Sequence, residues 1–86
     1  MPEAPRTLRQ WLTELEADPG VGAVAVSPAT QAALLDLARV AAHASERIAA
    51  PMTAFMAGVA FAGLDEAERA ARVRALVDRL EARYGG

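Results

Sequence analysis

The feature that most constrains this chain is a run of 17 residues, Ile48 to Leu64, that contains no charged side chain. A membrane-spanning helix needs about 20 consecutive apolar residues. This run is shorter, is rich in alanine and glycine, and contains Pro51. A helix that is apolar on every side is typical of a buried position. We therefore expect residues 51–62 to form the central, buried helix of a small domain, with Met52 and Met56 as core side chains.

A helix is predicted before this run, close to the N-terminus. Thr7 and Gln10 have the spacing of a capping box, in which each side chain bonds the other residue's backbone N–H. One helical face then follows, made of Leu8, Trp11, Leu12 and Leu15. The segment Asp18-Pro19-Gly20 ends the helix. We expect Trp11 to anchor this helix on the core.

Two more helices are predicted on either side of the apolar run. Ser27 followed by Pro28 is a strong helix start, and this helix is expected to continue to about Arg47. Asp65 with Glu68 has the spacing of a second capping box. The core face of the last helix is predicted to consist of Val73, Leu76, Val77, Leu80 and Tyr84.

The segment between the first two helices, residues 18–27, reads as a linker. Its apolar part, Val21–Val26, has no second strand to pair with, and a lone strand would leave backbone groups without partners. We expect an extended linker that lies on the core. The prediction is an all-α, small four-helix bundle-like domain over residues 1–86, with a short N-terminal tail at 1–6.

Composition excludes several classes of function. The chain has no cysteine, so disulfides and thiolate chemistry are excluded, and its net charge of -2 gives no reason to expect a nucleic-acid partner. The residues MPEAPRTLRQW lack the apolar core of a signal peptide, so we expect a cytoplasmic protein without a membrane partner. A domain of 86 residues buries a modest core, which favours dimerisation or docking on a partner protein.

Polar residues share one face of the second predicted helix and its end. They are spaced by 3, 4, 3 and 1 positions and comprise Asp36, Arg39, His43, Glu46 and Arg47. His43 could exchange protons near neutral pH, with Glu46 orienting it, while the arginines could clamp an anion such as phosphate. The alternative is an ordinary solvated face with ion pairs. A metal site is not expected, because His43 and Glu46 supply two ligands where three or four are needed.

The junction between the second and third helices is a further candidate. The N-terminus of a helix can receive an anion through its free N–H groups, and Thr53 and Arg47 would add a hydroxyl and a charge. The alternative is a plain helix–helix turn in which Thr53 bonds locally. The candidate ligand-binding set is therefore Arg39, His43, Glu46, Arg47 and Thr53, with no catalytic residue and no cofactor.

The segment LLDLARVAAHASERIAAPMTAFMAG resembles a small uncharacterised helical domain of GC-rich bacteria. The matching positions are Leu34 to Arg39, Ala42, His43, Arg47, Ala50, Pro51, Thr53, Phe55 and Gly58, and the pair Trp11-Leu12 also fits. Domains of this kind occur alone, or beside or fused to a molybdenum-cofactor guanylyltransferase-like domain. The resemblance implies an accessory to molybdopterin nucleotide chemistry.

Two functions remain open from the sequence. The first is a non-catalytic helical interaction module that binds a protein partner or a second copy of itself. The second is a domain that binds a small phosphate-bearing molecule at the corner formed by His43, Arg47 and Thr53. The absence of a catalytic motif favours a protein that is not an enzyme.

Overall fold

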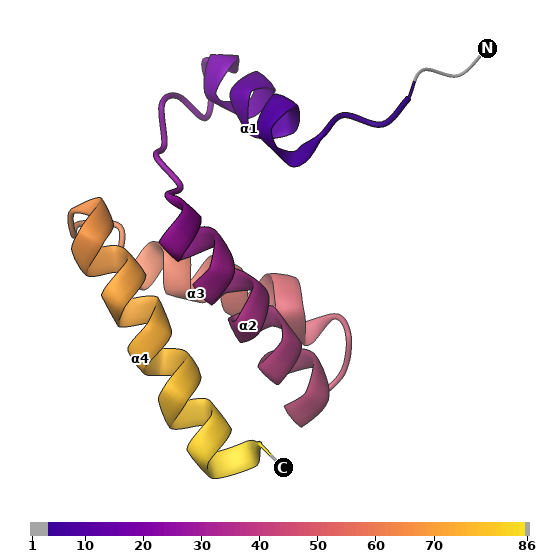
Figure 1. The fold of residues 1–86 in the computed structure, drawn as a ribbon, viewed down its shortest axis with the longest axis vertical. Coiled ribbons are helices and arrows are strands. Elements are labelled where there is room, and N and C mark those ends of the chain that lie inside the picture. The colour runs from indigo at the N-terminus through magenta and orange to yellow at the C-terminus, as the bar shows by residue number, and fades with distance from the viewer. Residues whose placement is uncertain (1–3, 86) are drawn as a thin grey trace.

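The structure is a computed structural model that describes residues 4–85. Within these residues all regular secondary structure is helical, which confirms the predicted all-α class with four helices (Figure 1). The helices are α1 (Leu8–Ala17), α2 (Pro28–Ala44), α3 (Ala49–Ala60) and α4 (Glu66–Tyr84). Residues 1–3 of the predicted N-terminal tail, and Gly86, lie outside the described residues.

The starts of α1, α2 and α4 confirm the prediction, whereas α3, predicted over residues 51–62, begins two residues earlier and spans Ala49–Ala60. The Thr7–Gln10 capping box is present with both of its hydrogen bonds, and Ser27 Oγ accepts from the backbone N–H of Thr30 at 3.2 Å. Asp65 caps α4 by accepting from the N–H of Glu68 at 2.8 Å. The predicted end of α2 near Arg47 is wrong, because the backbone leaves helical geometry at Ser45.

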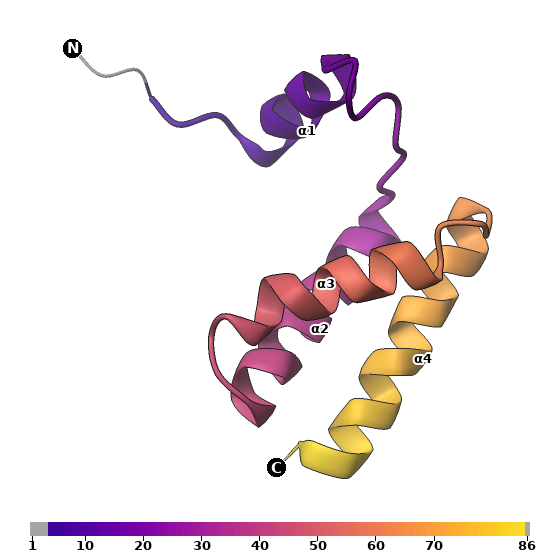
Figure 2. The same cartoon turned by 180° about the vertical axis from the view of Figure 1, so that it is seen from behind.

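The core is a three-helix arrangement in which α2 packs against both α3 and α4 (Figures 1 and 2). Leu37 of α2 is fully buried, and Val77 of α4 is 1% exposed. The cluster around them is completed by Ala33, Val40, Ala57 and Val73. This core holds few large side chains. Because α2 contacts both α3 and α4, it positions these two helices.

The prediction that α3 is buried on every side is wrong. Among the described residues of α3, Ala57 alone is buried, whereas Met52 and Met56, expected in the core, are 62% and 70% exposed. The physical reason is that α3 contacts α2 through a narrow side of small residues. The last helix, α4, packs along α2 and does not cover the opposite side of α3 (Figure 2).

The prediction that Trp11 anchors α1 on the core is also wrong. Trp11 is 51% exposed, and within the described chain no residue of α1 is buried. In both views α1 stands away from the three-helix core at the end of the connector (Figures 1 and 2). The radius of gyration is 14.2 Å, compared with about 12 Å for a compact domain of this length.

The connector, residues 18–27, forms a turn and then continues without regular structure. Gly22 adopts a φ of +79°, a left-handed conformation that glycine accepts without strain. The expectation that the apolar part lies on the core holds in part. Residues 23–26 line a hollow of about 610 Å³ together with parts of α3 and α4, but Val21 and Val24 are half exposed.

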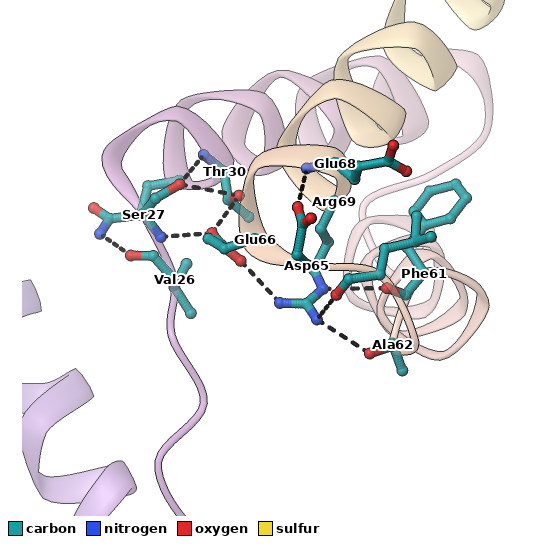
Figure 3. Close-up of polar contacts among 11 residues, drawn as sticks. Val26, Ser27, Thr30, Phe61, Ala62, Asp65, Glu66, Glu68 and Arg69 are labelled. Atoms are coloured by element: carbon teal, nitrogen blue, oxygen red, sulfur yellow. Dashed lines mark hydrogen bonds and ion pairs between the residues drawn. The ribbon is translucent and has the colours of Figure 1, made fainter.

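A carboxylate at the start of α4 holds the connector in place (Figure 3). Glu66 Oε1 accepts from the backbone N–H of Ser27 at 2.7 Å and from the hydroxyl of Thr30 at 2.6 Å. Its other oxygen pairs with Arg69 at 2.8 Å. The Arg69 guanidinium also donates to the carbonyls of Phe61, Ala62 and Leu64. Glu66 and Arg69 thereby join the end of the connector, the start of α2 and the turn after α3.

Candidate functional site

The structure brings two of the predicted ligand-binding residues together. Arg39 and His43 line a hollow of about 460 Å³ with Val40, Glu81 and Gly85. The Arg39 guanidinium donates to the Glu81 carboxylate at 2.5 Å and lies 3.9 Å from Asp36. The hydrogen bond to Glu81 raises the pKa of Arg39. A guanidinium that is already neutralised by carboxylates is a weak clamp for an anion, so this hollow offers little net positive charge.

The remaining predicted residues do not join this hollow. Glu46 and Arg47 lie in the exposed turn between α2 and α3, and neither lines the hollows of about 690, 610 and 460 Å³ on the described surface. Thr53 lies on α3, where its hydroxyl donates to the carbonyl of Ala49 at 2.7 Å. Thr53 therefore bonds locally, in the manner of the plain helix–helix turn that the sequence left open.

The N-terminus of α3 offers few backbone donors to an anion. The N–H groups of Ala49 and Ala50 donate to the carbonyls of Glu46 and Arg47, at 2.9 and 3.2 Å. Pro51 has no N–H to donate. The first turn of α3 thus satisfies its own donors, and binding of a phosphate-bearing molecule at this corner stays a prediction.

Several large apolar side chains are exposed together on the outer side of α3. We call this surface the α3 face, and it consists of Ile48, Met52, Phe55, Met56 and Val59. Each of these side chains is between 62% and 72% exposed. Their spacing of 4, 3, 1 and 3 positions places all of them on one side of the helix. The side opposite them carries Ala57, which is the residue of α3 that packs on α2.

An apolar groove adjoins the α3 face. It has a volume of about 690 Å³, and its lining includes Val40 of α2, Ala57 of α3, and Leu80 and Tyr84 of α4. Met56 belongs to both surfaces, since it lines the groove and is also part of the α3 face. A partner on the α3 face could therefore extend a side chain into the groove between α3 and α4.

A second apolar surface is found on α1. We call it the α1 face, and it consists of Leu8, Trp11, Leu12 and Leu15. Leu8 and Trp11 are 56% and 51% exposed, and the two other leucines are partly exposed. The sequence predicted this face correctly as a stripe, but wrongly as one that covers the core of its own chain.

The sequence analysis did not predict that the α3 face would be exposed, although a signal for it was present. The large side chains of residues 48–60 are concentrated on one side of the helix, and the small ones occupy the other. Small residues allow two helices to approach closely. The position of the small residues therefore indicates which side packs inward, and the large residues remain outside.

Two other kinds of site find no support in the described residues. Within residues 4–85, no group of three histidine, aspartate or glutamate side chains could hold a metal ion. No helix in the same part of the chain combines the length and apolar character needed to cross a membrane.

Comparison with known families provides one match. The model of a domain of unknown function, DUF6457, matches residues 3–85, which is nearly the whole chain. The chain belongs to this family. Comparison of this DUF6457 domain with the curated proteins and with the solved structures found no match. The family assignment agrees with the expectation of a small uncharacterised domain.

Proposed function

We propose that this DUF6457 domain is a non-catalytic interaction module whose working surface is the α3 face, and that this face binds an amphipathic helix of a protein. The observation that carries the proposal is the exposure of five large apolar side chains, each more than three-fifths exposed, on one charge-free helix. Exposed apolar side chains that occur singly are normal on protein surfaces, whereas a contiguous group marks an interaction site.

The area of the α3 face is large for a domain of this size. A full apolar side chain of this kind presents about 200 Å², so five that are about two-thirds exposed present on the order of 600 Å². This lies at the upper end of the largest apolar patch on a typical monomer. A helix that covered it would remove most of this surface from water.

The shape and composition of the surface favour a helix as the ligand. The α3 face lies beside the open groove of about 690 Å³ between α3 and α4. A helix-in-groove complex uses such a surface, because an amphipathic helix presents anchors at positions i, i+3, i+4 and i+7. Met52 and Met56 have flexible, polarisable side chains that adapt to the anchors of a partner.

A finer proposal concerns the setting in which the module works. The resemblance of residues 34–58 to domains found beside or fused to molybdenum-cofactor guanylyltransferase-like proteins supports an accessory role in molybdopterin nucleotide chemistry in the cytoplasm. Its test is to add the purified domain to such a guanylyltransferase at equal concentration. A guanylylation rate that is unchanged by the domain would contradict the accessory role.

The interaction proposal is tested with methionine methyl groups, because two of the three methionines in the chain lie on the α3 face. The full chain is labelled with ¹³C-methyl methionine and titrated with a synthetic amphipathic peptide that carries residues 4–20. We expect the Met52 and Met56 methyl signals to move and the Met1 signal to stay in place.

A matched pair of variants completes this test. Phe55 and Leu35 are 72% and 71% exposed, and Leu35 lies on α2, outside the α3 face. Phe55→Ser should abolish the methionine shifts, and Leu35→Ser should leave them unchanged. The titration is run at a chain concentration at which the mass is that of one chain, 9.0 kDa, so that α1 of a second copy does not already cover the face. Methionine signals that do not move at saturating peptide would then show that the face does not bind an amphipathic helix.

A further inference from the structure

We infer that the helix bound by the α3 face is α1 of a second copy of this chain, so that two copies exchange their α1 helices in a symmetric dimer. This inference rests on the proposed function, and it names the partner of the same surface. Two observations carry it independently of each other. One is the match between the α1 face and the α3 face, and the other is the position of α1 in the structure.

The α1 face has the properties that the α3 face requires of a ligand. Its residues occupy positions i, i+3, i+4 and i+7, which is the spacing of the anchors of a groove-binding helix. The charged residues of α1, which are Arg9, Glu14 and Glu16, lie outside this stripe. The α3 face contains no charged residue either. The contact would therefore bury apolar surface on both sides without desolvating a charge.

The position of α1 favours exchange over docking within one chain. The connector is attached to the core at its end, where Ser27 is bonded by Glu66 and the carbonyl of Val26 by the side chain of Gln31. From that point the connector leads α1 away from its own α3 (Figures 1 and 2). A helix that projects from its own core is exposed to a second copy, and exchange of one element between identical copies is a low-cost route to a dimer.

The area also agrees with that of a stable dimer. In a symmetric exchange each copy contributes its α3 face and its α1 face. The α3 face presents on the order of 600 Å², and the partly exposed α1 face adds roughly 300 Å². The total per copy, up to about 900 Å², reaches the roughly 800 Å² per partner of a standard interface. Either face used alone would fall below this value.

The first experiment measures mass and the environment of Trp11 together, because Trp11 is the sole tryptophan of the sequence. In analytical ultracentrifugation of the full chain we expect the mass to rise with concentration from 9.0 kDa to twice that value. The fluorescence of Trp11 should shift to the blue over the same concentration range. A mass that stays at 9.0 kDa at all concentrations would overturn the exchange.

Matched variants connect the dimer to the α3 face. Phe55→Glu should weaken the dimer by about tenfold or more, since a charge is placed at the centre of the apolar contact. Leu35→Glu places the same charge at a side chain of equal exposure on α2 and should leave the dimer unchanged. Because both positions are exposed, the helical content of each variant should equal that of the parent chain. Equal weakening by both variants would contradict the assignment to the α3 face.

The second experiment identifies the contact between copies and uses the absence of cysteine from the chain. One sample carries Thr13→Cys with a nitroxide label on α1, and the other carries ¹³C-methyl methionine without a label. In the mixture we expect the Met52 and Met56 signals to broaden. A dimer in which the Met52 and Met56 signals stay sharp would overturn the exchange. A monomer with blue-shifted Trp11 fluorescence would overturn it as well, because it would show that α1 folds back on its own chain.

The two proposals fail in different ways. If the chain stays monomeric but the peptide of residues 4–20 still moves the methionine signals, the α3 face binds a helix and the homodimer is wrong. If neither dimer nor peptide binding is observed, both proposals are wrong.

Discussion

Replacement of Glu66 by glutamine should destabilise the fold in a manner that depends on pH. The hydroxyl of Thr30 and the backbone N–H of Ser27 donate to this carboxylate, and Arg69 pairs with it. The hydrogen bond from Thr30, followed by the bond from the Ser27 backbone, lowers the pKa of Glu66 from 4.5 to about 2. Glutamine keeps the shape of the side chain but removes the charge that these donors stabilise.

The expected magnitude follows from the lowered pKa. Each pKa unit corresponds to about 1.4 kcal/mol, so a decrease from 4.5 to about 2 corresponds to about 3 kcal/mol. The Glu66 side chain is 24% exposed, and solvent screening reduces this figure to about 2 kcal/mol. A depressed carboxyl pKa stabilises the fold fully above the unfolded-state pKa. The contribution is lost as the pH falls through the folded-state pKa of about 2.

The assay is urea unfolding of the parent chain and of Glu66→Gln, followed by circular dichroism at pH 7, 5 and 3. The difference in the free energy of unfolding should be about 2 kcal/mol at pH 7 and less than half of that at pH 3. Glu68→Gln is the control, because Glu68 is an exposed carboxylate in the same first turn of α4. It should cost about 0.5 kcal/mol, from the helix dipole alone. A difference for Glu66→Gln that does not change with pH would refute the reasoning.

Two further substitutions test the core and the donors to Glu66. Leu37→Ala should lower the free energy of unfolding by about 2 to 5 kcal/mol, since Leu37 is fully buried; a smaller loss in urea unfolding would show that α2 is not the centre of the core. Thr30→Val should cost about 1 to 2 kcal/mol, since it removes the hydroxyl donor from a side chain that is 3% exposed. Thr30→Val should also raise the pKa of Glu66. An unchanged titration of the Glu66 carboxyl group by NMR would contradict the hydrogen bond between Thr30 and Glu66.

The helix starts could be predicted from the sequence because their causes are local. Thr7, Ser27 and Asp65 each cap a helix with a bond that closes within three residues. The role of Glu66 could not be predicted in this way. Its partner Ser27 lies 39 positions away, and within its own helix Glu66 is indistinguishable from any other acidic residue of a first turn. Contacts across the fold leave no periodic signal in one sequence.

The burial of the apolar helices could be predicted only in part, for a different reason. Burial of an apolar side chain is favourable, but the sequence does not show which surface will cover that side chain. Met56 and Ala57 are neighbours in the same charge-free run, and one is 70% exposed while the other is buried. Side-chain size decides between them, because the small residue allows α3 to lie close to α2. The polar face of residues 36–47 was predicted from spacing along one helix, and such spacing cannot show that Glu81 of α4 pairs with Arg39.

The composition of the core leads from the fold to the function. Half of the eight buried apolar residues in the described chain are alanines, and the rest are Leu37 and three valines. The larger side chains of Trp11, Phe55 and the two methionines of α3 are outside it. Burial of such side chains contributes about 1.5 to 3 kcal/mol each, which a domain of 86 residues can hardly forgo. Covering the α3 face would therefore stabilise the fold as well as form the complex, so a chain that binds its partner should also unfold at a higher urea concentration when the partner is present.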